Sequence, residues 1–129
     1  METIRVIGKR ILLVDDERWV RECIKRLLAL DSHEITEASN GPEAVALFAE
    51  GVFDVVITDY DMPKMTGDEL VNQIRSRAPR QPILMITACA AQFGRDQNPA
   101  NAILGKPFEI AELRRMLVNL LSQKSITVP

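Results

Sequence analysis

Cysteine, histidine and aromatic residues are scarce in this chain of 129 residues. Two cysteines and a single histidine fit no zinc-site or disulfide spacing, which argues against both kinds of stabilisation. We expect Cys23 and Cys89 to be small, buried residues with reduced thiols. His33 is expected to be a surface residue, and Trp19 to be partly buried beside the apolar stripe of a helix.

Long apolar runs and a dominant charge are also missing. The longest apolar runs fall well short of the roughly 20 residues that a membrane-spanning helix needs. Residues 1–10 lack the apolar segment of a signal peptide. The 16 basic and 18 acidic residues nearly cancel, which argues against a surface for polyanions. We therefore expect a cytoplasmic protein that binds neither nucleic acid nor a membrane directly.

The residues that are present predict one globular α/β domain. Hydrophobic residues make up 47% of the chain and charged residues 26%, a composition typical of a folded domain. Short apolar runs predict five strands, and helical periodicity or capping patterns predict four helices between and after them. The predicted strands are 10–14, 33–38, 55–57, 83–87 and 102–104, and the predicted helices are 18–30, 40–51, 66–74 and 110–121.

This alternation of strands and helices predicts a parallel five-stranded sheet covered by helices on both faces, with the strand order left open. Two capping boxes support the helix starts, with Asn40 followed by Glu43 and Thr66 followed by Glu69. Between the fourth and fifth predicted strands, Gly94 and Pro99 disfavour a long helix. We expect a short turn or a loop there.

Chemically useful side chains follow four of the strands at the point where each strand ends. Asp15 and Asp16 follow the first strand, Asp59 the third, Thr87 the fourth and Lys106 the fifth. Carboxyl ends of parallel strands share one sheet edge, where ligands of open α/β sheets bind. Carboxylates without histidine or cysteine suit a hard cation such as Mg²⁺. With a lysine and a hydroxyl, they would suit phosphoryl transfer to the Asp59 carboxylate.

Five motifs in order make the chain resemble the receiver domain of bacterial response regulators. The likeness runs from Lys9 to about Leu121, and the motifs are Leu12-Leu13-Val14-Asp15-Asp16-Glu17, Asp59-Tyr60-Asp61-Met62-Pro63, Gly67, Thr87-Ala88 and Lys106-Pro107-Phe108. The resemblance implies a flavodoxin-like, doubly wound sheet in the order 2-1-3-4-5. It also implies a receiver domain at residues 10–122, between a tail at 1–9 and a tail or linker start at 123–129.

The resemblance further implies roles for the site residues. Asp59 would accept a phosphoryl group from the phosphohistidine of a histidine kinase or a phosphotransfer protein. Asp16, Asp59 and the backbone carbonyl of Asp61 would bind Mg²⁺, and Asp15 would act largely through water. Thr87 and Lys106 would contact the phosphoryl oxygens.

The receiver would then catalyse only its own phosphorylation and dephosphorylation. It would switch an output domain or a downstream protein, and a homodimer is one possible form.

Two positions depart from the family pattern. Receivers usually carry Tyr or Phe three residues before the lysine, as a rotamer switch, and this chain has Ile103 there. The segment between Thr87 and Lys106 is also a few residues shorter than in most receivers. Both departures fall on the fourth helix and fifth strand, the face that most receivers use for output.

Two other functions are weighed against this one. Asp59-Tyr60-Asp61 resembles the motif of haloacid-dehalogenase phosphatases, but that motif sits on the first strand of a longer chain and continues to Thr or Val where this chain has Pro63. A receiver-like module that works without phosphate would have lost Asp59, Asp16 or Lys106, and all three are present.

Overall fold

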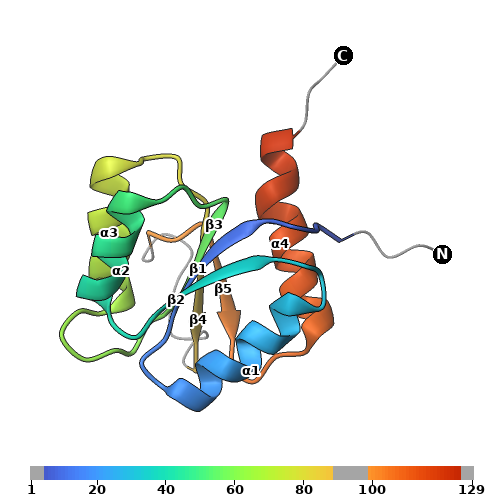
Figure 1. Cartoon of the computed structure of the whole chain (residues 1–129), viewed down its shortest axis with the longest axis horizontal. Coiled ribbons are helices and arrows are strands. Elements are labelled where there is room, and N and C mark those ends of the chain that lie inside the picture. Colours follow the sequence, from blue (N-terminus) through green and yellow to red (C-terminus); the bar gives the residue numbers. More distant parts are fainter. Residues whose placement is uncertain (1–4, 89–98, 126–129) are drawn as a thin grey trace.

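The computed structural model describes residues 5–88 and 99–125, without the side chains of 122–125. Strands and helices alternate from residue 10 to residue 87 as the sequence predicts, and a fifth strand and a fourth helix follow from residue 102 (Figure 1). In chain order the elements are β1 (Arg10–Val14), α1 (Arg18–Ala29), β2 (Glu34–Ala38), α2 (Gly41–Glu50), β3 (Val55–Asp59), α3 (Gly67–Arg77), β4 (Ile83–Thr87), β5 (Ala102–Gly105) and α4 (Ile110–Ser125).

The five strands form one parallel sheet in the order β2-β1-β3-β4-β5. Helices α2 and α3 cover one face of this sheet, and α1 and α4 cover the other (Figure 1). The predicted doubly wound fold and its strand order are therefore confirmed. Because β1 and β3 are neighbours near the middle of the sheet, their carboxyl ends lie side by side.

Alternate side chains of the central strands pack into two separate cores. Ile11 and Leu13 of β1 pack with α1 and α4, whereas Leu12 and Val14 pack with α2 and α3. All four are essentially inaccessible to solvent. A strand buried on both faces reads as a continuous apolar run, which explains why the pattern in the sequence was clear.

Both predicted N-caps are present, and the two glutamate side chains bond to the Ser39 N–H and the Thr66 hydroxyl, where a complete capping box would use the N-cap backbone N–H. The Asn40 side chain accepts a hydrogen bond from the backbone N–H of Glu43 at 2.8 Å. The hydroxyl of Thr66 accepts one from the backbone N–H of Glu69 at 3.3 Å and donates to the Glu69 carboxylate at 3.2 Å. These bonds satisfy N–H groups that a helix start leaves unpaired, and they place the start of α3 directly after the β3 loop.

Three predictions about single side chains are wrong. His33 is buried, with 8% of its surface exposed, and its Nδ1 accepts a hydrogen bond from the backbone N–H of Lys9 at 3.0 Å. Trp19 is 81% exposed, and Cys23 is also exposed. Cys89 and the predicted irregular segment around Gly94 lie outside the described residues. Within the described ranges, no helix is long and apolar enough to cross a membrane.

Candidate functional site

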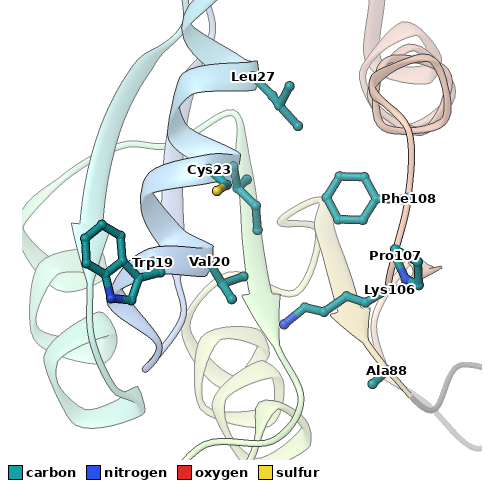
Figure 2. Close-up of a pocket in the computed structure, with 9 residues that line it drawn as sticks. Trp19, Val20, Cys23, Leu27, Ala88, Lys106, Pro107 and Phe108 are labelled. Carbon is teal, nitrogen blue, oxygen red and sulfur yellow. The ribbon is translucent and has the colours of Figure 1, made fainter.

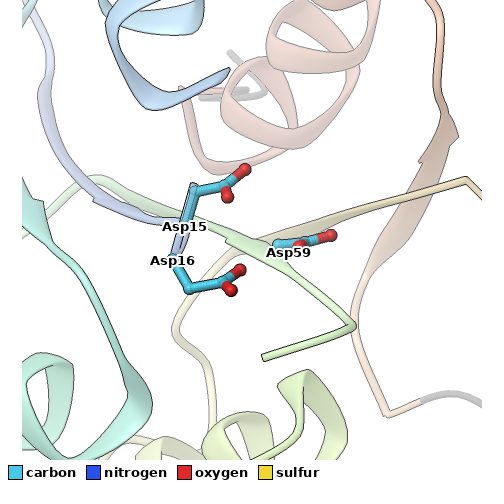
Figure 3. Close-up of side chains that lie close together, drawn as sticks. All are labelled: Asp15, Asp16 and Asp59. Carbon is cyan, nitrogen blue, oxygen red and sulfur yellow. The ribbon is translucent and has the colours of Figure 1, made fainter. Parts of the chain in front are cut away.

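Three carboxylates meet at the carboxyl edge of the sheet. Asp15 and Asp16 follow β1, Asp59 is the last residue of β3, and their side chains point into the same space (Figure 3). One ligand oxygen from each lies within 4.8 Å of the others. Asp15 and Asp59 are buried, with 1% and 6% of their surfaces exposed, whereas Asp16 is exposed. The predicted cluster is therefore confirmed as a geometric arrangement.

Lys106 brings a positive charge to this cluster from the end of β5. Its Nζ lies 3.3 Å from Asp59 Oδ1 and 3.4 Å from Asp15 Oδ2. The lysine donates to both carboxylates, so it lies between them and partly offsets their repulsion. Residues that are far apart in sequence meet here because the strands are parallel, so that the carboxyl ends of β1, β3 and β5 lie at the same edge of the sheet.

The ionisation of Asp59 is strongly shifted. Burial raises the pKa of its carboxyl from 3.8 to about 6; Lys106 opposes the rise, and Asp15 reinforces it. The pKa of the Lys106 ammonium is also raised. Burial alone would lower it, but the charges of Asp15 and Asp59 outweigh burial. A buried acid with a shifted pKa beside a lysine and two further acids is typical of a reactive site.

The start of α3 packs tightly against the end of β3. The backbone N–H of Gly67 donates to the Tyr60 carbonyl at 2.8 Å, and the backbone N–H of Tyr60 donates to Asp59 Oδ1 at 3.0 Å. A Cβ atom at Gly67 would lie 2.6 Å from the Asp59 carbonyl oxygen and 2.8 Å from the Tyr60 Cα. Gly67 is therefore required for this close approach, which fixes the backbone beside the Asp59 carboxylate.

The remaining predicted positions lie around this cluster. Thr87 ends β4, is fully buried, and its carbonyl accepts a hydrogen bond from the backbone N–H of Lys106 at 2.9 Å. Asp61 is exposed in the loop after β3. Ile103, at the position where an aromatic residue was expected by resemblance, is partly buried and packs against the core on the α2 and α3 face.

Arg21 contacts the acidic pair and Glu37 contacts Arg21, and the sequence predicts neither contact. Arg21 of α1 donates from Nη1 to the backbone carbonyl oxygen of Asp15 at 2.6 Å and from Nε to Glu37 Oε1 at 3.1 Å. No signal in the sequence identifies them, because an arginine on an amphipathic helix and a glutamate on an edge strand both read as ordinary solvent-facing residues.

A family model provides the deciding comparison. Residues 11–118 match the model of the response regulator receiver domain, which includes every residue of the carboxylate cluster and Lys106.

The chain belongs to the response regulator receiver domain family.

Individual relatives agree with this assignment. The response regulator MprA of Mycobacterium sp. (strain KMS) is 38% identical over 120 residues, which are 90% of this chain and 52% of MprA. The chemotaxis protein CheY-3 of Vibrio cholerae serotype O1 is 37% identical over 123 residues, which are 91% of this chain and 95% of CheY-3. This receiver domain thus spans about half the length of the MprA proteins and nearly all of CheY-3.

A solved structure extends the likeness to three dimensions. The response regulator protein TrrA of Thermotoga maritima, in complex with Mg²⁺ and BeF, has a TM-score of 0.82 and 36% sequence identity. The alignment covers 88% of this receiver domain and 99% of TrrA. Neither this structure nor the relatives above support the alternative function as a phosphatase.

The cluster of this receiver domain fits a small hard cation. Its three carboxylates provide oxygen ligands within 4.8 Å of one another, and no histidine or cysteine belongs to the group. Mg²⁺ prefers oxygen ligands and keeps several waters, which suits an edge where Asp16 is open to solvent. Asp15, Asp16 and Asp59 are therefore the residues that would hold such an ion.

Proposed function

We propose that this receiver domain accepts a phosphoryl group on Asp59 in a step that requires Mg²⁺. The observation that carries the proposal is the contact of Lys106 Nζ with both Asp59, at 3.3 Å, and Asp15, at 3.4 Å, beside a cluster of three carboxylates. A phosphoryl group attached to Asp59 would add negative charge at a point where a lysine and a metal ion can balance it.

The donor in this proposal is a phosphohistidine of a histidine kinase or a phosphotransfer protein. An Asp59 carboxylate oxygen attacks phosphorus, the P–N bond breaks, and its electron pair returns to the imidazole, which takes up a proton. The product is an acyl phosphate on Asp59. With a pKa of about 6, about nine in ten Asp59 carboxyls are ionised at pH 7 and able to attack.

Asp16, Asp59 and the backbone carbonyl of Asp61 are the proposed Mg²⁺ ligands, and Asp15 is proposed to act largely through water. The metal would neutralise charge as it develops on the phosphoryl oxygens. Thr87 and Lys106 are proposed to contact those oxygens. By this reading the domain catalyses only its own phosphorylation and dephosphorylation, and it signals to an output domain or a downstream protein.

Residues 10–122 are proposed to form the receiver unit, between a tail at 1–9 and a tail or linker start at 123–129.

A groove next to Lys106 supports a protein as the phosphoryl donor. The groove holds about 590 Å³ between α1 and the segment that joins β5 to α4 (Figure 2). Its walls are mostly apolar and comprise Trp19, Val20, Cys23, Ile24, Leu27, Ala88, Lys106, Pro107 and Phe108. Because Lys106 belongs to both the groove and the carboxylate cluster, a helix seated in the groove would reach the phosphorylation site.

The central test is labelling with acetyl phosphate and Mg²⁺, followed by mass spectrometry of the adduct. We expect one phosphoryl group per chain, on Asp59, and none in Asp59→Asn or in excess chelator. Asp54→Asn is the matched control, because Asp54 lies at the opposite end of the same strand and should leave labelling intact. Labelling that persists in Asp59→Asn would contradict the proposal. Repeated turnover of a generic phosphomonoester would instead support a phosphatase, and absence of labelling would support a phosphate-independent module.

The groove has its own test. Trp19→Ala should slow transfer from purified, autophosphorylated histidine kinases of the source organism but leave labelling by acetyl phosphate unchanged. Val52→Ala is the control, because Val52 is an apolar residue that is 75% exposed and does not line the groove. Equal transfer rates in Trp19→Ala and in the unmodified domain would rule out Trp19 as part of the docking surface.

A further inference from the structure

We infer that Arg21, held by Glu37, is a positioning residue for the Mg²⁺ ligands. The inference rests on the proposed function, because it concerns the same metal site. Arg21 donates to the Asp15 carbonyl oxygen at 2.6 Å and to Glu37 at 3.1 Å, so its guanidinium bridges the β1 turn and strand β2. Both side chains are partly buried, with 16% of Arg21 and 29% of Glu37 exposed.

The bond to the Asp15 carbonyl matters because this carbonyl belongs to the peptide group that joins Asp15 to Asp16. The backbone N–H of Asp15 already donates to the Ala38 carbonyl at 3.1 Å. The Asp15 carboxylate accepts from the backbone N–H of Glu17 at 2.9 Å and from Lys106 at 3.4 Å. The bond from the Glu17 N–H closes a ring that contains the peptide group between Asp15 and Asp16, and Arg21 adds a direct contact to the carbonyl of that group.

The orientation of that peptide plane sets the direction in which the Asp16 side chain leaves the backbone. Asp16 is exposed and is one of the three cluster carboxylates, so packing does little to fix it. A hydrogen bond from a charged donor is stronger than one between neutral groups. Arg21 therefore helps to orient the Asp16 carboxylate toward the position of the ion before any ion binds.

The bridge to Glu37 keeps Arg21 in place. Glu37 receives hydrogen bonds from Arg21 through Oε1 and from Lys25 through Oε2, the latter at 3.0 Å. The bond from Lys25 and that from Arg21 lower the pKa of the Glu37 carboxyl, although burial opposes them. Glu37 thus stays ionised at neutral pH, and its bond to Arg21 Nε restricts the orientation of the planar guanidinium. A lysine ammonium in place of the guanidinium would be a point charge without this fixed plane.

Positioning and simple electrostatics predict opposite effects for the loss of Arg21. A positive charge near the cluster repels Mg²⁺, so removing it should tighten metal binding if charge alone mattered. If Arg21 aims Asp16, removing it should weaken binding. Loss of an outer contact that orients a ligand typically lowers metal affinity by about tenfold or more.

The experiment is isothermal titration of Mg²⁺ into the unmodified chain, Arg21→Met and Lys25→Met, with urea unfolding of each metal-free protein. We expect about a tenfold loss of affinity in Arg21→Met. Lys25→Met removes the same charge from the same helix and the same Glu37 but leaves the Asp15 carbonyl untouched. Its affinity should change by less than about twofold, because the charge of this partly exposed side chain is screened.

Affinity in Arg21→Met equal to or tighter than in the unmodified chain would overturn the inference, and so would an equal loss in Lys25→Met. If Arg21→Met does not fold, Arg21→Lys decides: it keeps the charge but not the bridge, so weaker binding supports positioning and unchanged binding overturns it. An unmodified chain that binds no Mg²⁺ and takes no label on Asp59 would instead contradict the proposed function.

Discussion

Replacing Asp59 with asparagine should stabilise the metal-free protein, even though it removes the proposed phosphoacceptor. The folded state raises the pKa of this carboxyl from 3.8 to about 6, mainly because it is buried. The folded protein therefore holds the proton more tightly than the unfolded chain does. The resulting stability is fully present below pH 3.8 and is lost as the pH rises through about 6.

The size of this effect follows from the two pKa values. One pH unit corresponds to about 1.36 kcal/mol, so the interval from 3.8 to about 6 corresponds to roughly 3 kcal/mol of lost stability at pH 7. Asparagine has nearly the same shape and carries no charge. The free energy of unfolding of Asp59→Asn should therefore exceed that of the unmodified protein by an amount that grows by about 2 kcal/mol between pH 4 and pH 7.

Urea unfolding followed by circular dichroism, in chelator and at a series of pH values, measures this difference. Asp54→Asn is the control for the same change of side chain at the other end of this strand, where Asp54 Oδ2 accepts a hydrogen bond from the Arg10 N–H. Saturating Mg²⁺ should reduce the advantage of Asp59→Asn, because the ion compensates the buried charge. A variant that is no more stable than the unmodified protein at pH 7, with a difference that does not grow with pH, would refute the reasoning.

Three further predictions concern neighbouring residues. Asp16→Ala should weaken Mg²⁺ binding more than Asp15→Ala, because a direct ligand contributes charge and geometry together. Calorimetric titration measures both affinities, and equal losses would contradict this assignment. Gly67→Ala should cost about 1–3 kcal/mol of unfolding free energy, because its Cβ would collide with backbone; a smaller cost in urea unfolding would mean that the loop relaxes. Burial lowers the pKa of His33, and protonation of His33 breaks its hydrogen bond from the Lys9 N–H, so the folded state loses stability as the pH falls below 6.5. His33→Gln should reduce this loss. Urea unfolding at a series of pH values, with Asp59→Asn as the background, measures it.

The sheet and its active edge could be predicted because they depend on local patterns. Strand β4 has the predicted bounds, and β3 contains the predicted run 55–57 and extends to Asp59, since a run of apolar residues buried on both faces has few other interpretations. The sequence also predicted that three side chains lie close together, because the carboxyl ends of parallel strands share one edge; they are those of Asp15, Asp59 and Lys106.

Features that depend on contacts between distant segments could not be predicted. His33 is buried and accepts a hydrogen bond from the Lys9 N–H, and no pattern around position 33 indicates this contact. Trp19 and Cys23 border a groove whose other wall comes from the segment around Phe108, so their exposure depends on how α1 and α4 are spaced. The bridge from Arg21 to Glu37 likewise depends on which strand pairs with β1.

Lys106 links two surfaces through one side chain, since its stem lines the apolar groove while its ammonium contacts Asp59 and Asp15. A groove occupant that shifts this lysine must also change the affinity of the carboxylates for a cation or a phosphoryl group. Thermodynamic reciprocity requires the converse with the same coupling free energy, so a change in charge at Asp59 alters the affinity of the groove for its occupant. In the proposed transfer, phosphorylation of Asp59 would therefore change the affinity of the groove for the donor through the Lys106 side chain.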